Sequence, residues 1–262
     1  MSSTQRSPQR STSSPTTIRL GLIVPFYNHE HAIRQTVAAL KPHGLPCWLV
    51  DDGSDARCAP VLEDLAKRES RWLTLIRCPV NRGKGIAVVT GFAAAQLAGC
   101  THALQIDADG QHDFTAIPRI AELAQAHPDA IVSGVPLFDA SAPASRRIGR
   151  KLTTLWVRIN TLSAQIEDAM CGFRVYPLGS IMDLARRGSV GSRMEFDPEI
   201  LVRAVWDGVP VVSMPTNVTY PLDGVSHFKM WRDNVRISWM HTRLFFGMLR
   251  RAPLLVTRRL RS

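Results

Sequence analysis

Two aspartates one residue apart, Asp107 and Asp109, follow an apolar segment of the chain, and Gln111 stands two positions further. Carboxylates this close repel each other unless a cation lies between them, and a hard divalent ion prefers oxygen ligands. Mg²⁺ or Mn²⁺ bound in this way keeps open positions for the phosphate oxygens of a substrate. The same spacing also occurs in simple turns where an aspartate caps the next helix. The tripeptide Asp107-Ala108-Asp109 alone is therefore compatible with either a metal site or a capped turn.

Two further polar clusters have the composition of ligand-binding loops. Asp51–Asp55 contains three acids and a glycine, and one of these acids could accept hydrogen bonds from a ribose or a base edge. An ordinary Asp-Gly turn is the alternative. Asn81–Gly85 brings two cations and two glycines to the start of a helical pattern, which favours an anion. Neither GxxxxGK[ST] nor GxGxxG is present, so a P-loop and a dehydrogenase Rossmann fingerprint gain no support.

These clusters follow short apolar runs that alternate with helical periods, a pattern typical of a parallel sheet built from βαβ units. Strands are predicted at Arg19–Pro25, Cys47–Asp51, Trp72–Arg77, His102–Asp107 and Ala130–Gly134, with helices at Glu30–Leu40, Ala56–Ser70, Lys84–Ala98 and Thr115–Ala126. A helix at Ser145–Leu162, a strand at Cys171–Tyr176, a helix at Pro198–Trp206 and a strand at Val209–Met214 are expected to follow. The predicted fold is a doubly wound, mostly parallel α/β sheet flanked by helices. Ligands bind beyond the carboxyl ends of strands in such sheets, which is where the polar clusters lie.

Composition excludes several other classes of protein. The 262 residues are 45% hydrophobic and 21% charged, as in ordinary globular proteins. The sequence contains no run of 18 apolar residues, which is about the length that a transmembrane helix needs. The five cysteines are scattered, which argues against a disulfide framework or a zinc cluster and favours a reducing compartment. The net charge of +10 comes from the ends of the chain, because residues 229–262 hold nine Lys/Arg and one Asp. Such an end is expected to attract phosphates.

Read in order, the motifs IVPFYNHE, LVDDGSD, NRGKGIAVVTGF, LQIDADGQHD and DAMCGFRVY resemble those of family 2 glycosyltransferases with the GT-A fold. The last two are most similar to the dolichol-phosphate mannosyltransferase branch. The resemblance implies a nucleotide-diphosphate-sugar donor, Mg²⁺ or Mn²⁺, and usually inversion at the anomeric carbon. A lipid-linked acceptor, either a polyprenyl phosphate or a hydroxyl of a lipid or glycan precursor, is the leading expectation. A sugar nucleotidyltransferase and a non-catalytic sugar-nucleotide-binding protein are the alternatives.

The resemblance also implies roles for individual residues. It places a base pocket at Pro25, Tyr27 and Glu30, nucleoside binding at Asp52, and the nucleotide beside Lys84. Asp107 would approach both ribose and metal, Asp109 would bind the metal, and Gln111 could be a further ligand. His227 would lie in a loop over the donor phosphates, and Asp168 on the acceptor side. A hydroxyl acceptor would need Asp168 as a base. An ionised phosphate acceptor needs none and would depend more on arginines, for which Arg146, Arg147, Arg150 and Arg174 are available, with Arg147 and Arg174 as the leading candidates. The basic segment Arg146–Arg158 could instead be a solvated helix face.

Three regions are expected along the chain: a disordered leader over residues 1–17, a GT-A domain over 18–228, and a basic amphipathic helical tail over 229–262. The leader lacks the apolar core of a signal peptide. The tail carries an apolar stripe from Ile237 to Leu249, with arginines at seven-residue intervals beside it. This stripe is predicted to contact an anionic membrane surface, which would make the protein peripheral on the cytoplasmic face; docking on its own domain is the alternative. No nucleic-acid-binding motif accompanies the charge, so a nucleic-acid partner is not expected.

Overall fold

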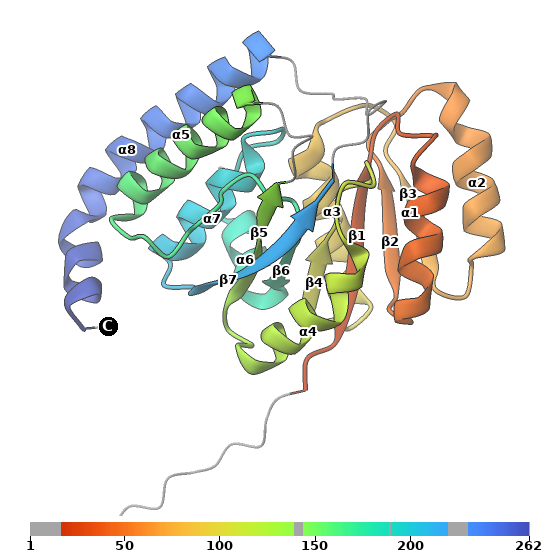
Figure 1. Cartoon of the computed structure of the whole chain (residues 1–262), viewed down its shortest axis with the longest axis horizontal. Helices are drawn as coiled ribbons and strands as arrows, with labels where there is room; N and C mark the ends of the chain where they lie inside the picture. The colour runs from red at the N-terminus through yellow and green to blue at the C-terminus, as the bar shows by residue number, and fades with distance from the viewer. Residues whose placement is uncertain (1–16, 139–143, 189, 220–229, 262) are drawn as a thin grey trace, which may run out of the picture.

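A computed structural model of the chain describes residues 17–138, 144–188, 190–219 and 230–261. A seven-stranded sheet in the order β3-β2-β1-β4-β6-β5-β7 runs through its centre (Figure 1). The strands are β1 (Leu20–Phe26), β2 (Cys47–Asp51), β3 (Leu73–Arg77), β4 (His102–Gln105), β5 (Ile131–Phe138), β6 (Arg174–Pro177) and β7 (Val211–Val218). All neighbours pair in parallel except β6, which is antiparallel to both β4 and β5. The predicted mostly parallel α/β fold is confirmed.

Helices cover both faces of the sheet, and the central strands are therefore apolar on both sides. All seven residues of β1 are buried. Its side chains alternate, because Leu22 and Val24 belong to one apolar cluster and Ile23 to the other. One cluster includes side chains of α1 (Ile33–Leu40), α2 (Ala59–Arg68) and α4 (Ile117–Ala126). The other includes α3 (Lys84–Leu97), α5 (Ala144–Thr161), α6 (Leu178–Arg186), α7 (Phe196–Trp206) and α8 (Met230–Arg261).

Most element boundaries lie close to those predicted, but β5 and β7 each continue four residues beyond their predicted ends and β6 begins three residues later than predicted. The first helix begins at Ile33 rather than Glu30, because the chain turns sharply at Asn28, whose φ of 52° is left-handed. Helix α6 was not predicted. It has only nine residues and opens with Leu-Gly-Ser, a weak helix-forming sequence. Its buried Leu178, Ile181 and Met182 show that packing stabilises it.

Most of the predicted membrane-facing stripe of the tail lies inside the protein, and only its last residue, Leu249, is half exposed. Ile237, Met240, Leu244 and Met248 of α8 are buried in the core cluster that also contains α5 and α7 side chains. Arg243 of α8 pairs with the fully buried Glu199 of α7, with a nitrogen–oxygen distance of 3.3 Å. The prediction that this stripe contacts lipid is therefore wrong, because the domain itself covers it. The leader, apart from Thr17, lies outside the described residues.

Among the helices of the described residues, none combines the length and the apolar character that crossing a membrane requires.

Candidate functional site

The reversal of strand order between β1 and β4 defines the position of the site. Successive strands β1, β2 and β3 are added in one direction, and β4 then pairs with the free side of β1. A doubly wound sheet opens a crevice at such a point, beyond the carboxyl ends of the two strands. Tyr27 and Glu30 follow β1 at this edge, and Asp107, Asp109 and Gln111 follow β4.

A cluster of alternating charges occupies this edge. The Lys84 ammonium at the start of α3 lies 2.7 Å from Asp107 Oδ1 and 2.7 Å from Asp197 Oδ2. Burial alone would lower the pKa of Lys84, but the charges of Asp107 and Asp197 outweigh it and raise the pKa above its usual value. Burial likewise acts to raise the pKa of Asp107, but the Lys84 charge prevails and lowers it. Both groups are therefore ionised at neutral pH.

Asp197, in the first turn of α7, is a member of this cluster that the sequence interpretation missed. Its Oδ1 accepts a hydrogen bond of 3.0 Å from Gln105 Nε2, and its backbone oxygen accepts one of 2.8 Å from Arg174 Nη1. Asp197 is 90 positions from Asp107 along the chain, and an acid at a helix start reads as a simple stabilising charge. Its only sequence signal is its place directly before the helix predicted at Pro198–Trp206.

Arg174 has a different environment from the one expected of a cation that binds an acceptor. Its side chain is fully buried in the sheet, where Nε donates to Ser133 Oγ at 3.0 Å. Together with its bond to the Asp197 backbone, this contact ties β6 to β5 and to the start of α7. Arg174 therefore supports the charge cluster from inside the protein.

The residues after β4 fit a divalent cation that is shared with a substrate. Asp107 and Asp109 supply two carboxylates, and Asp109 Oδ1 already accepts a 3.1 Å hydrogen bond from the Gln111 backbone, which orders the turn. A Cβ on Gly172 would lie 2.3 Å from Asp107 Oδ2, so only glycine allows the backbone to pack against this carboxylate. Within the described residues, no three His, Cys, Asp or Glu side chains converge on one point. Two carboxylates match Mg²⁺-type sites that are completed by substrate phosphates and water.

The predicted nucleoside-binding residues lie in connected loops after β1 and β2. Pro25 is buried at the end of β1, and Tyr27 and Glu30 are half-buried. Asn28 Oδ1 accepts the Asp55 backbone N–H at 2.9 Å, which links the two loops. The backbone N–H of Glu30, its Cys58 hydrogen bond and the charge of Arg57 hold the pKa of this carboxyl below its usual value, against a smaller effect of burial.

Asp52 supplies the anion at the start of α3. Its two oxygens accept hydrogen bonds of 2.8 and 2.7 Å from the backbone nitrogens of Arg82 and Gly83. A further N–H at this terminus, that of Gly85, donates to the Ser192 carbonyl at 2.8 Å. Gly83 has a φ of 107°, and a Cβ there would collide with that carbonyl. The carboxylate of Asp52 and the carbonyl of Ser192 thus occupy several N–H groups at the helix terminus that was expected to bind a substrate anion.

On the predicted acceptor side, Asp168 is part of a tight clamp. Arg150 of α5 contacts both of its oxygens, at 3.0 and 2.8 Å. Asp168 Oδ1 also accepts the backbone N–H groups of Met170 and Cys171, at 2.9 and 2.7 Å. The clamp holds the segment that leads to Gly172 against Asp107. Arg147 is exposed near the start of α5, whereas the side chain of Arg146 and all of His227 lie outside the described residues.

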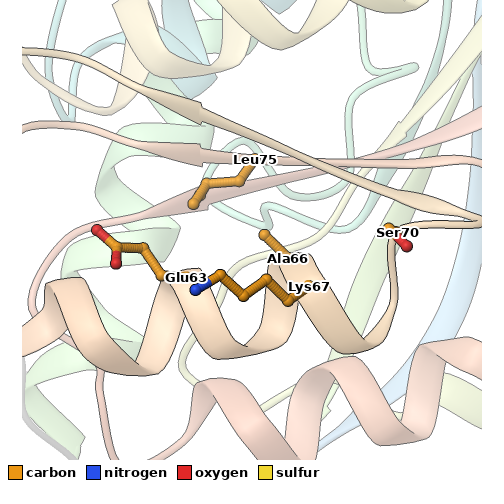
Figure 2. Close-up of a pocket in the computed structure, with 5 residues that line it drawn as sticks. All are labelled: Glu63, Ala66, Lys67, Ser70 and Leu75. Carbon is orange, nitrogen blue, oxygen red and sulfur yellow. The ribbon is translucent and has the colours of Figure 1, made fainter.

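A surface pocket between α2 and β3 is separate from this cluster. Glu63, Ala66, Lys67, Ser70 and Leu75 line it (Figure 2). None of them belongs to the predicted site, and β3 is the edge strand of the sheet.

Comparison with known proteins places these features in a family. Residues 22–178 match the family described as Glycosyl transferase family 2. A dolichyl-phosphate beta-glucosyltransferase of Dictyostelium discoideum is 29% identical over 253 residues, covering 86% of this chain and 75% of that protein. Polyprenol monophosphomannose synthase of Mycolicibacterium smegmatis is 26% identical over 228 residues, 84% of each protein. An undecaprenyl-phosphate 4-deoxy-4-formamido-L-arabinose transferase of Pectobacterium atrosepticum is 29% identical over 164 residues; the match covers 60% of this chain and 48%, about half, of that relative.

Solved structures share the fold. A mannosyltransferase from Pyrobaculum calidifontis, in complex with GDP-Man and Mn²⁺, superposes with a TM-score of 0.59 at 18% identity, covering 90% of this chain and 66% of that one. Glucosyl-3-phosphoglycerate synthase from Mycobacterium tuberculosis gives a TM-score of 0.61 at 14% identity over 93% of this chain and 85% of that one. The fold agrees with the expected GT-A architecture. Since the family match spans more than half of its length, the chain belongs to glycosyl transferase family 2.

Proposed function

We propose that this protein transfers a sugar from a nucleotide-diphosphate-sugar to a polyprenyl phosphate, using Mg²⁺ or Mn²⁺, with inversion at the anomeric carbon. The observation that carries the proposal is the Asp107 carboxylate beyond β4, held between the Lys84 ammonium and the Gly172 backbone. Three relatives support the choice of acceptor: two have names that contain dolichyl-phosphate or undecaprenyl-phosphate, and the third is named a polyprenol monophosphomannose synthase.

On the donor side, Asp107 and Asp109 would hold the metal, with Gln111 as a further ligand. When bound, the metal stabilises the negative charge that develops on the departing diphosphate. Lys84 adds a fixed positive charge beside Asp107, oriented by Asp197. Pro25, Tyr27, Glu30 and Asp52 would form the nucleoside pocket. His227 is proposed to approach the donor phosphates.

On the acceptor side, a phosphate oxygen would attack the anomeric carbon while the bond from that carbon to the diphosphate oxygen breaks. The diphosphate leaves with the electron pair, and no proton has to be removed because the acceptor phosphate is already ionised. This chemistry agrees with an Asp168 that Arg150 engages through both oxygens. Asp168 and Arg174 then act as positioning residues, and the exposed Arg147 is the proposed partner of the acceptor phosphate.

The proposed acceptor is a membrane lipid, so we infer that the protein works as a peripheral protein at the cytoplasmic face of a membrane. The buried stripe of α8 cannot supply the contact. Other residues must therefore contact the membrane.

A donor screen tests the proposal. We expect one nucleotide sugar to raise the unfolding temperature in the presence of Mn²⁺ or Mg²⁺, because a ligand that binds the native state stabilises it. With polyprenyl phosphate added, that donor should release its nucleoside diphosphate. Release of pyrophosphate from a sugar phosphate and a nucleoside triphosphate would instead show a nucleotidyltransferase. Donor binding without turnover would show a binding protein.

A further inference from the structure

Helix α8 has a second apolar face, on the side opposite to the buried one. Trp231, Val235, Trp239, Phe246 and Leu249 are each at least half exposed, and the side chain of Trp239 is 63% exposed. An α-helix turns by about 100° per residue, so these five side chains lie within a sector of about 80°. The buried Ile237, Met240, Leu244 and Met248 fill a sector of similar width on the other side.

Helix α5 repeats this arrangement beside it. Ile148, Leu152 and Leu155 are all more than half exposed, Ile148 at 67%, and they share a sector of about 60°. The two helices lie side by side at one edge of the molecule (Figure 1). Trp156 of α5 joins them, with its ring 6.0 Å from that of His241 and 6.5 Å from that of Phe245. The exposed apolar sectors border this seam from both sides and so form one surface, which we call the outer face of α5 and α8.

Basic residues border the outer face on its two far sides. On α5, Arg147, Lys151 and Arg158 project from the side of the apolar sector that points away from α8. On α8, Arg232, Arg236 and Arg250 project from the side that points away from α5. Helix α5 contains no acid, and the single acid of α8, Asp233, is buried. Every formal charge that these two helices place around the face is therefore positive.

We propose that the outer face of α5 and α8 binds the surface of an anionic phospholipid membrane; this inference rests on the proposed lipid acceptor. Tryptophan and other aromatic rings lie favourably at a membrane interface, and arginines beside them attract anionic headgroups. A second copy of this chain is the other occupant to consider. Self-association through this face would bring the two basic borders together, and like charges disfavour it.

The position of the face suits the site. Helices α5 and α8 both begin on the side of the molecule toward which β5 and β7 point, where the carboxyl ends of the strands carry the charge cluster (Figure 1). From another side of α5, Arg150 holds Asp168. Helix α5 therefore lies between a membrane bound to the outer face and the segment that supports Asp107.

Co-sedimentation with vesicles tests the surface without any donor or acceptor. The full chain should pellet at low salt with vesicles of phosphatidylcholine containing phosphatidylglycerol, and should stay in solution with phosphatidylcholine alone. Replacing Lys151 and Arg250 by Gln should weaken binding about 25-fold, since each basic residue near the surface contributes roughly five-fold. Replacing Lys67 and Arg71 by Gln removes two charges elsewhere on the surface and should leave binding unchanged.

The apolar part of the face needs its own variants. Leu152→Gln combined with Trp239→Gln should lower binding at least ten-fold, whereas the control Leu97→Gln, at a side chain 90% exposed on α3, should not. All these side chains are exposed, so the unfolding temperature should stay within a few degrees and show that the variants fold. Wild-type protein that does not pellet on anionic vesicles would overturn the proposal. So would equal pelleting by the Lys151→Gln/Arg250→Gln variant or by the Leu152→Gln/Trp239→Gln variant. If the wild-type protein is a dimer in solution and the Leu152→Gln/Trp239→Gln variant is a monomer, the outer face is instead an interface between two copies of this chain. Sugar transfer to acceptor in detergent reports separately on the proposed function.

Discussion

The clamp between Asp168 and Arg150 separates two roles for this acid, and replacement of each partner tests them. If Asp168 positions the segment before Gly172, Asp168→Asn and Arg150→Met should have similar effects, because each breaks the same contact. If Asp168 is a general base, Asp168→Asn alone should cause a loss of about 10² to 10⁴-fold. Arg150→Met would then retain most activity, since it leaves the carboxylate in place.

The size of the effect follows from the contacts. In the Asp168→Asn variant, the amide would keep an oxygen for the backbone N–H groups of Met170 and Cys171, but it would present an NH₂ group to the Arg150 guanidinium. Hydrogen bonds to charged groups contribute about 1.5–3 kcal/mol each, and breaking a fully buried ion pair costs about 3–5 kcal/mol. The Asp168 and Arg150 side chains are 10% and 18% exposed, so the pair is not fully buried. We therefore expect the free energy of unfolding to fall by about 2–3 kcal/mol. For a chain of this size, that lowers the unfolding temperature by roughly 5–10 °C.

Two measurements decide between the roles: thermal unfolding, and the transfer rate with acceptor in detergent. Positioning predicts parallel losses of stability and rate in both variants, with Lys151→Met on the same helix as a control that changes neither. A large rate loss in Asp168→Asn together with a nearly normal rate in Arg150→Met would refute positioning and favour a hydroxyl acceptor.

Three further predictions concern the metal site and stability. Asp109→Asn should lower turnover by orders of magnitude at an unchanged unfolding temperature, and excess EDTA should abolish the wild-type activity; full activity in EDTA would exclude the metal. Gly172→Ala should raise the Mn²⁺ concentration needed for half-maximal rate, because its Cβ would displace Asp107 Oδ2, now 2.3 Å from that position. Burial lowers the pKa of His241 to about 4, so the folded state disfavours the protonated ring. The free energy of unfolding should therefore be constant above about pH 6.5 and fall between pH 6.5 and 4, as measured by denaturant titration, and His241→Leu should reduce this fall.

The sequence predicts the sheet well because its strands are apolar runs bounded by turn residues. The range predicted for β2, Cys47–Asp51, agrees with the structure residue for residue. The carboxyl-end rule then brings Tyr27, Asp52 and Asp107 to one edge although they are far apart in the chain. Motif loops at strand ends are thus predictable from local pattern and fold together.

What could not be predicted depends on contacts between distant segments. The partner of Lys84 on α7, Asp197, is 113 positions away, and nothing in its local sequence identifies it. Arg174 looks like an exposed cation in a short strand, but bonds to Ser133 and the Asp197 backbone allow it to be buried. In α8 the periodicity identifies an apolar stripe but does not say what covers it. The buried stripe containing Met240 and the exposed face containing Trp239 are distinguished only by the position of α5 and α7.

Sugar transfer to a lipid phosphate can be followed on the acceptor itself. A labelled donor sugar, identified in the donor screen, is incubated with Mn²⁺ and either a polyprenyl phosphate or the matching polyprenol, and the lipid extract is counted. We predict label in the polyprenyl phosphate only, released by mild acid as expected for a sugar phosphodiester, and none when Asp107 is replaced by Asn. Label in the polyprenol would rule out a phosphate acceptor, and equal labelling by the Asp107→Asn variant would rule out the proposed role of Asp107.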